Sequence, residues 1–313
     1  MAIDDETYPK LYTLFQIVKL ARLPIALPLL PMFFVGVLFA MATGAQFILE
    51  NVIWGFSILF LNAIAAAYAN DYFDYEGDKY NEQFGFSGGS GVLLAHPELR
   101  RFAKWAAVFL FIISFLLTAI FTWLASLPIW TIGYIAIGVF FFWFYTAPPI
   151  KLCYRGLGEP PHLLAGIMIP AWGYLVITGT LDFKLFIFAI PIGLFFLTVI
   201  LNFEIPDREA DLHAGKSNLI VKKGRRFSFR LVMALYVVST IYFTILALSN
   251  WLTERINFWV IVILSLIPFT VSFYSALYAP DDKEGAIPYA VKNAVSSFVY
   301  LFLMTLYLVY VVA

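Results

Sequence analysis

An uncharged stretch of 46 residues runs from Trp105 to Ile150 and reads WAAVFLFIISFLLTAIFTWLASLPIWTIGYIAIGVFFFWFYTAPPI. A helix needs about 20 apolar residues to cross the hydrocarbon core of a bilayer, so this stretch is long enough for two crossings. Pro128 marks the turn between them. A transmembrane β-barrel would instead show alternating strands of about ten residues. The stretch therefore predicts two membrane-spanning helices.

Seven further uncharged runs of 19 to 27 residues flank this stretch; they cover residues 23–49, 51–70, 160–181, 185–203, 231–253, 256–280 and 293–313. Each is close to the length that one crossing needs. The sequence thus predicts an all-α, multi-pass membrane protein with nine transmembrane helices. Because no low-complexity linker separates the runs, we expect residues 1–313 to form a single domain.

The composition excludes several other classes of protein. Apolar residues make up 62% of the chain, against about 45–50% in soluble domains. Cys153 is the only cysteine, which excludes a disulfide scaffold, a zinc finger and an iron–sulfur site. The net charge is zero, so the composition has no nucleic-acid signature, and we expect the bilayer rather than a nucleic acid as the surrounding partner.

The basic residues are distributed unevenly between the two sides of the predicted bundle. Eighteen of the 20 lie on the side of the amino terminus, and only Lys184 and Arg255 lie on the other. By the positive-inside rule the first side is cytoplasmic, so the amino terminus is inside and the carboxyl terminus outside. We therefore expect an integral protein of the plasma membrane.

Two acidic clusters follow apolar runs on this cytoplasmic side. The first reads NDYFDYEGD from Asn70 to Asp78, and the second reads DREAD from Asp207 to Asp211. On a continuous helix, Asn70, Asp71, Asp74 and Asp78 would share an arc of about 100°. Pro206 precedes the second cluster and can kink or restart its helix.

Clustered carboxylates repel one another and are costly to desolvate beside lipid. A divalent cation removes both costs, and Mg²⁺ is commonly shared between a few carboxylates and a substrate phosphate. The clusters therefore indicate a site that binds a diphosphate through Mg²⁺. The alternative is a pair of solvated helix ends, which is the usual reason for a run of charges. Carboxylates in a transporter would more often lie near the bilayer midplane.

Four sequence segments resemble motifs of the UbiA-type intramembrane aromatic prenyltransferases. The acidic clusters are similar to the family's NDxxDxxxD and DxxxD motifs, the latter followed by Ala214-Gly215-Lys216. Residues 145–159 resemble its YTxPPxKLxYRGLGE segment, and residues 22–36 its RPxxLxxxxxPxxxG opening. The resemblance implies a ring of nine helices around a central cavity with a cytoplasmic cap, and Mg²⁺-dependent transfer of a polyprenyl chain to an aromatic acceptor.

The resemblance also implies roles for individual residues. The predicted metal ligands are Asp71, Asp74, Asp78, Asp207 and Asp211. The predicted diphosphate-binding residues are Asn70, Arg22, Lys151, Arg155 and Lys216. Tyr145 is a candidate to stabilise an allylic cation through its ring, and Asp78 or Asp211 a candidate to remove a proton from the acceptor. Tyr68 and Asn202 are expected to line the substrate cavity.

The segment FSGGSGVL at residues 86–93, together with YRGLGE, is most similar to the menaquinone-pathway branch, whose members prenylate 1,4-dihydroxy-2-naphthoate. Other acceptors within the family are 4-hydroxybenzoate, homogentisate and a glyceryl phosphate lipid. The chain departs from the family pattern at Leu23, Gly91 and Glu204. The competing hypothesis from another class is an ion-coupled membrane transporter.

Overall fold

The computed structural model describes residues 7–26, 28–81, 88–249 and 251–313. Every regular element in these residues is helical, which confirms the all-α prediction. The elements are α1 (Thr7–Leu20), α2 (Leu23–Ala26), α3 (Leu29–Ala42), α4 (Leu49–Phe73), α5 (Tyr75–Asp78), α6 (Val92–Ala95), η1 (Pro97–Leu99), α7 (Arg100–Leu124), α8 (Trp130–Phe144), η2 (Leu152–Arg155), α9 (Glu159–Thr178), α10 (Phe183–His213), α11 (Leu219–Lys223), α12 (Arg225–Ser249), α13 (Phe258–Tyr278) and α14 (Lys283–Val312).

Seven helices in the described part of the chain are long and apolar enough to cross a membrane. They are residues 49–73, 97–124, 159–178, 183–213, 225–249, 258–278 and 283–312. Two of the nine predicted crossings, α3 and α8, form helices of only 14 and 15 residues. At 1.5 Å per residue, each covers roughly 22 Å of a hydrocarbon core of about 30 Å. Prolines limit both, since α3 follows Pro28 and α8 lies between Pro128 and Pro148.

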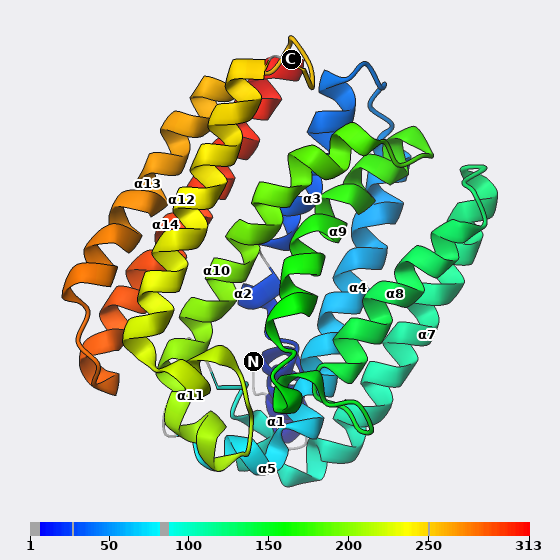
Figure 1. Ribbon diagram of the computed structural model, residues 1–313. Coiled ribbons are helices and arrows are strands. Elements are labelled where there is room, and N and C mark those ends of the chain that lie inside the picture. The colour runs from blue at the N-terminus through cyan, green and yellow to red at the C-terminus, as the bar shows by residue number, and fades with distance from the viewer. Residues whose placement is uncertain (1–6, 27, 82–87, 250) are drawn as a thin grey trace, which may run out of the picture.

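The helices form a bundle in which α3 and α9 lie at the centre, with α7 and α8 on one flank and α12, α13 and α14 on the other (Figure 1). The carboxyl terminus lies at one end, and α1, α5 and α11 lie towards the opposite end. Large apolar side chains such as Ile112, Leu248 and Ile263 are exposed on the outer helices. Lipid is the solvent in which such a surface is stable.

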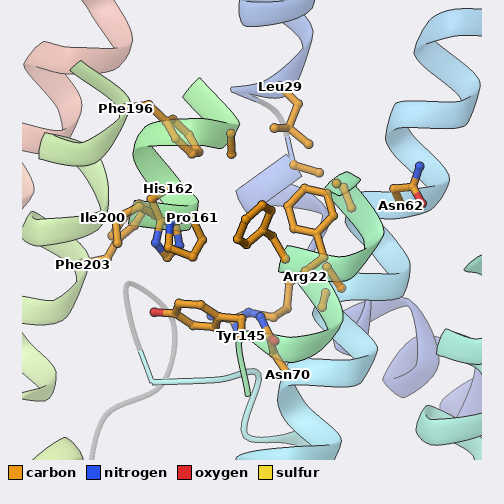
Figure 2. Close-up of a pocket in the computed structure, with 18 of the residues that line it drawn as sticks. Arg22, Leu29, Asn62, Asn70, Tyr145, Pro161, His162, Phe196, Ile200 and Phe203 are labelled. Carbon is orange, nitrogen blue, oxygen red and sulfur yellow. The ribbon is translucent and has the colours of Figure 1, made fainter. Parts of the chain in front are cut away.

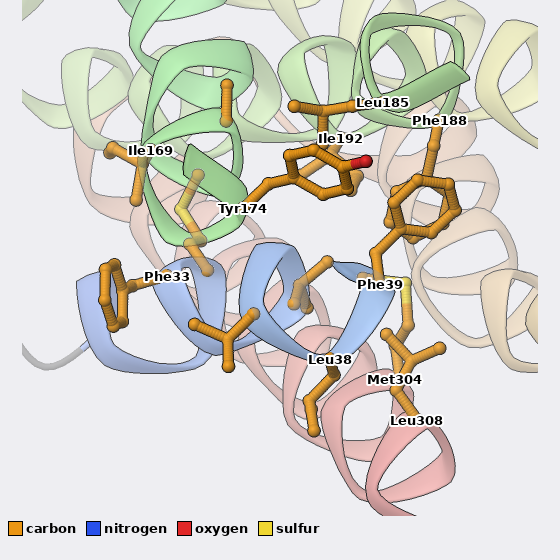
Figure 3. Close-up of a cluster of buried hydrophobic side chains, with 14 of the residues drawn as sticks. Phe33, Leu38, Phe39, Ile169, Tyr174, Leu185, Phe188, Ile192, Met304 and Leu308 are labelled. Carbon is orange, nitrogen blue, oxygen red and sulfur yellow. The ribbon is translucent and has the colours of Figure 1, made fainter. Parts of the chain in front are cut away.

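The central helices approach one another very closely because glycine faces the contact. A Cβ atom on Gly36 of α3 would lie 1.8 Å from the Pro170 carbonyl oxygen, and one on Gly173 of α9 would lie 2.1 Å from the Phe33 carbonyl oxygen. Small residues that let backbones touch are typical of helix packing in membranes. Beyond this contact, Phe39 stacks on Phe188 of α10 at a ring distance of 4.3 Å (Figure 3). The close α3–α9 contact therefore fixes the position of α9, which lines the central cavity.

Candidate functional site

A cavity of about 350 Å³ lies between α2, α4, α8, α9 and α10. Its chemistry changes along its length. One end is lined by carboxylates of the two acidic clusters, and the other by apolar and aromatic side chains that include Leu59, Phe141 and Trp172. Figure 2 shows Tyr145 between these regions, with Asn70 on one side and His162 and Phe196 on the other. A charged head group and an apolar tail would both find a matching environment in this cavity.

The first acidic cluster is held by contacts from four segments of the chain. Arg22 places Nη1 3.5 Å from Oδ1 of Asp71, and the Ser90 backbone N–H donates to Oδ2 of the same carboxylate at 3.2 Å. The Tyr154 hydroxyl donates to Oδ1 of Asp74 at 2.9 Å, and the Thr146 hydroxyl donates to Oδ1 of Asn70 at 3.1 Å. These donors orient the cluster without neutralising all of its charge.

Asp78 is a buried carboxylate of this cluster. Its burial, followed by repulsion from Asp74 and Asp71, raises the pKa of Asp78 to about 8, although Lys216 and Arg22 oppose the shift. Gly89 packs directly against it. A Cβ atom at Gly89, which has φ of +78°, would lie 2.5 Å from Oδ2 of Asp78. Only glycine permits this approach, so the described part of the glycine-rich loop closes over the acids; Phe86 and Ser87 lie outside the described residues.

Lys216 joins the two clusters. Its Nζ lies 3.3 Å from Oδ2 of Asp74 and 3.0 Å from Oδ1 of Asp211. Burial by itself lowers the pKa of Lys216, but Asp74 and Asp211 outweigh burial and hold this pKa well above its usual value. The amide of Asn218 donates to the other Asp211 oxygen at 2.8 Å. Lys216 is therefore a permanent cation between α4 and α10, even though the two acidic motifs are far apart in sequence.

The donor set of the cavity fits Mg²⁺. Six carboxylates among the described lining residues (Asp71, Asp74, Asp78, Glu204, Asp207 and Asp211) face two cationic side chains, Arg22 and Lys216. Oε2 of Glu204 is buried without a hydrogen-bond partner in the described part of the chain. Within the same residues, no three His, Cys, Asp or Glu side chains already converge on one point. Mg²⁺ keeps several waters and takes one or two carboxylates plus phosphate oxygens, so it needs no such preformed group.

With all six carboxylates ionised, the wall has a formal excess of four negative charges, which also bears on the ligand. A diphosphate is itself an anion, and repulsion would oppose its binding to this wall at short range and low effective dielectric. Cations shared between the wall and the diphosphate would convert that repulsion into attraction. The residues present therefore suit a diphosphate only together with divalent cations.

The structure brings nine of the predicted residues to the cavity wall: Arg22, Asn70, Asp71, Asp74, Asp78, Tyr145, Asp207, Asp211 and Lys216. It places Lys151 and Arg155 away from that wall. Lys151 is exposed and its Nζ lies 4.8 Å from the centre of the Tyr154 ring, and Arg155 donates to the Pro149 carbonyl oxygen at 2.8 Å. Both side chains therefore contact residues of the loop that follows α8.

Tyr68 and Asn202 also lie away from the cavity wall. The Tyr68 hydroxyl donates to the Ile17 carbonyl oxygen at 3.1 Å, which ties α4 to α1. Asn202 is fully buried on α10, where its Oδ1 accepts from Nδ2 of Asn293 on α14 at 3.1 Å. Polar side chains that join helices are common in membrane proteins, and such a pair is not distinguishable from a ligand contact by sequence alone.

Several polar residues of the wall were not among the sequence predictions, and Glu204 and His162 are the two ionisable ones closest to Tyr145 or the second acidic cluster. Glu204 lies three residues before Asp207, and its departure from the family pattern was the available signal. His162 lies in the first turn of α9 and lacks any metal-binding spacing to the other histidines. The signal for His162 is its register, since His162, Ala165, Ile169 and Trp172 lie on one face of α9 and all line the cavity.

The sequence matches the model of the UbiA prenyltransferase family over residues 29–293. The chain therefore belongs to this family, whose members are prenyltransferases, and it is an integral membrane protein of the transferase class. No curated protein matches the chain.

Solved structures with a similar fold cover nearly the whole chain. A UbiA homolog from Archaeoglobus fulgidus bound to GPP and Mg²⁺ is 16% identical, with a TM-score of 0.63, and the match covers 93% of this chain and 99% of that one. A structure of digeranylgeranylglyceryl phosphate synthase is 16% identical, with a TM-score of 0.66 and coverage of 95% and 99%. A UbiA homolog from Aeropyrum pernix K1 is 14% identical, with a TM-score of 0.62 and coverage of 88% and 96%. At these identities the likeness shows the fold.

Proposed function

We propose that this protein transfers a polyprenyl group from polyprenyl diphosphate to an aromatic acceptor in a reaction that depends on Mg²⁺. The observation that carries the proposal is the junction at Lys216, where the two acidic clusters meet at one end of a cavity whose other end is apolar. The similar fold of an Archaeoglobus fulgidus homolog bound to GPP and Mg²⁺ supports the same class of substrate and metal here.

The acidic end binds the diphosphate. Asp71, Asp74, Asp78, Asp207 and Asp211 would hold the cations, which stabilise negative charge on the departing diphosphate. Arg22 and Lys216 lie beside these acids and add fixed positive charge where the diphosphate oxygens would lie. The Thr146 hydroxyl donates to the amide oxygen of Asn70 and so orients the Asn70 amide group at the same end of the cavity.

The apolar end binds the prenyl chain and keeps water away from the reacting carbon. Breaking the allylic C–O bond leaves a carbocation, which an aromatic face stabilises without reacting with it. Tyr145 lines the cavity between the acidic and apolar regions and is the residue we assign to this role. Exclusion of water by Phe141, Phe142 and Trp172 favours attack by the acceptor ring over hydrolysis.

We propose 1,4-dihydroxy-2-naphthoate as the acceptor, because the YRGLGE and FSGGSGVL segments are most similar to the menaquinone branch. A glyceryl phosphate lipid is the second candidate. The fold similarity to digeranylgeranylglyceryl phosphate synthase favours it, although that likeness extends to the fold alone. 4-Hydroxybenzoate and homogentisate are further acceptors to test.

We further propose that the protein crosses the plasma membrane nine times, with the acidic end of the cavity facing the cytoplasm. The distribution of basic residues supports this orientation, since 18 of 20 lie on that side of the predicted bundle. In this arrangement α3 and α8 are short crossings, and α2 extends the first of them.

A reconstituted transfer assay tests the proposal. Purified protein in liposomes receives geranylgeranyl diphosphate, Mg²⁺ and one acceptor at a time, and products are identified by mass spectrometry. We expect prenylated product from 1,4-dihydroxy-2-naphthoate and none in EDTA. Product only from 4-hydroxybenzoate, homogentisate or geranylgeranylglyceryl phosphate would overturn the acceptor assignment, and no release of diphosphate under any condition would overturn the enzymatic function.

A further inference from the structure

His162 projects from the first turn of α9 into the cavity. Its ring packs edge-to-face on Tyr145, with 4.9 Å between ring centres and an interplanar angle of 87°. On its other side lies Phe196, with a ring distance of 6.4 Å. Figure 2 shows His162 beside Pro161, on the wall opposite Arg22 and above the ring of Tyr145. His162 therefore lies between the apolar chamber and the acidic end.

The hydrogen bonding of His162 determines which ring nitrogen is free. Nδ1 lies 2.8 Å from the carbonyl oxygen of Gly158, one turn earlier in the chain. A carbonyl oxygen can only accept, so Nδ1 carries the hydrogen, and in the neutral ring Nε2 is then an acceptor. Nε2 is the other ring nitrogen, and it takes no part in this hydrogen bond to the backbone of α9. No described residue donates a hydrogen bond to it.

Three of the six carboxylates of the cavity wall, Asp71, Asp74 and Asp211, already have hydrogen-bond or ion-pair partners, whereas Oε2 of Glu204 has none among the described residues. Asp71 interacts with Arg22 and Ser90, and Asp74 with Tyr154 and Lys216. Both Asp211 oxygens have partners, since Oδ1 pairs with Lys216 and Oδ2 accepts from Asn218. These acids also form the wall that would hold cations. Nε2 of His162 differs because it is a proton acceptor on an otherwise apolar helix face that lines the same cavity.

We propose that His162 is the residue that accepts the hydroxyl proton of the aromatic acceptor, an inference that rests on the proposed prenyl transfer. The proton passes from the hydroxyl group to Nε2. The prenyl C–O bond breaks with its electron pair leaving on the diphosphate, and the activated ring carbon forms the new C–C bond. Loss of CO₂ from that carbon returns an electron pair to the ring oxygen, which takes the proton back from Nε2. Neutral His162 is thereby regenerated.

His162→Gln tests this role, because glutamine can accept a hydrogen bond but cannot take up a proton at neutral pH. We expect the kcat of prenyl transfer to fall about 100-fold or more, the range that general-base groups contribute. Binding of the unreactive analogue geranylgeranyl thiolodiphosphate with Mg²⁺ should stay within threefold of the wild-type value. This second readout shows that the variant is folded and that the diphosphate end is intact.

His213→Gln is the matched control. Nδ1 of His213 lies 2.7 Å from the Glu209 carbonyl oxygen, so it has the same tether to its own helix, but its ring is exposed and stacks on Tyr80 outside the cavity. We expect little change in transfer from His213→Gln. An equal loss in both variants would overturn the proposal, because it would show that the tether to the helix is what matters.

Imidazole rescue of His162→Ala separates proton transfer from packing. We expect added imidazole to raise the transfer rate of His162→Ala at least tenfold and to leave the wild-type rate unchanged. Transfer by His162→Gln within threefold of wild type, or no rescue in an Ala variant that still binds the analogue, would overturn the role of His162 while leaving the proposed function intact. Absence of transfer by the wild-type protein would contradict both.

Discussion

The two acidic clusters reach the same cavity by different backbone routes. The first cluster spans a break, because α4 ends at Phe73, Asp74 adopts φ of −86° and ψ of 1°, and α5 begins at Tyr75. The second lies on α10, which continues without interruption from Phe183 to His213 through Pro206. The first cluster is thus interrupted by a helix end, whereas the second lies on one continuous helix.

What they share is support from side chains of neighbouring segments. Tyr154 and Lys216 hold Asp74 at the break, so the carboxylate stays in place where the helix ends. On α10, Arg225 of α12 donates to the Ile205 carbonyl oxygen at 3.0 Å and to both oxygens of Glu209, on either side of Pro206. The comparison shows that contacts between elements position the acids, and each contact can be removed by one substitution.

The largest expected effect is the loss of a cluster. Asp74→Ala and Asp207→Ala should each lower kcat/KM for prenyl transfer by about 10²–10³-fold, because each removes a carboxylate that would hold cations against the diphosphate. Glu50→Ala, at the opposite end of α4, is the control and should change kcat/KM less than twofold. If only one of the two Asp variants loses activity, the clusters do not act on the same diphosphate.

Removing the bridge between the clusters should have the next largest effect. Lys216→Met is expected to lower kcat about 100-fold, because Asp74 and Asp211 lose the half-buried cation they share and the diphosphate loses a fixed charge. Lys223→Met removes an exposed lysine from nearby α11 and should change kcat less than twofold. Steady-state kinetics of both variants check this, and an active Lys216→Met protein would show that the bridge is dispensable.

The sequence could predict the meeting of the two clusters because both follow long apolar runs that the charge pattern assigns to one side of the membrane. It could not predict the contacts of the loops. In the loop after α8, Lys151 lies over the Tyr154 ring and Arg155 donates to the Pro149 carbonyl oxygen, and neither residue is among those that line the cavity. Asn202 and Tyr68 were expected to line the cavity, yet each has a polar partner on another helix.

Continuity of the helices was also hard to predict, because the sequence left it open at both clusters. A continuous helix through Asp78 and a possible break at Pro206 follow from intrinsic preferences. In the structure Tyr154 and Lys216 contact Asp74, where α4 ends, and Arg225 contacts the Ile205 carbonyl oxygen beside Pro206, where α10 continues. Intrinsic helix preferences apply to an isolated helix, whereas both of these segments contact side chains from other parts of the chain.

The metal affinity of the first cluster should depend on pH. Because the pKa of Asp78 is raised to about 8 in the metal-free protein, a proton competes with Mg²⁺ for this carboxylate below pH 8. The apparent Mg²⁺ affinity should therefore rise with pH by up to about tenfold per unit below pH 8 and level off above it. Calorimetric titration of the wild-type protein and of Asp78→Asn checks this, and the variant should lose the dependence. A wild-type affinity that is flat from pH 6 to 8 would contradict the assignment.

The smallest effect is expected at the support of the second cluster. Arg225→Met removes charged hydrogen bonds to Glu209 and Ile205, which should lower the free energy of unfolding by about 2 kcal/mol and kcat severalfold. Pro206→Ala should change both quantities less, since α10 already continues through this position. Thermal unfolding in detergent and transfer kinetics measure the two variants. A larger effect from Pro206→Ala would mean that the proline, and not Arg225, sets the shape of α10.

In the proposed reaction, cations join an acidic cavity wall to an anionic substrate. The direct measurement is the binding of geranylgeranyl thiolodiphosphate to the wild-type protein with Mg²⁺ and with EDTA, read by calorimetry. Because the described wall has six carboxylates and two cationic side chains, we expect binding to be at least about 100-fold tighter with Mg²⁺. Equal binding in EDTA would contradict this role of the cations, since the diphosphate would then be held without the cations that the two clusters are proposed to bind.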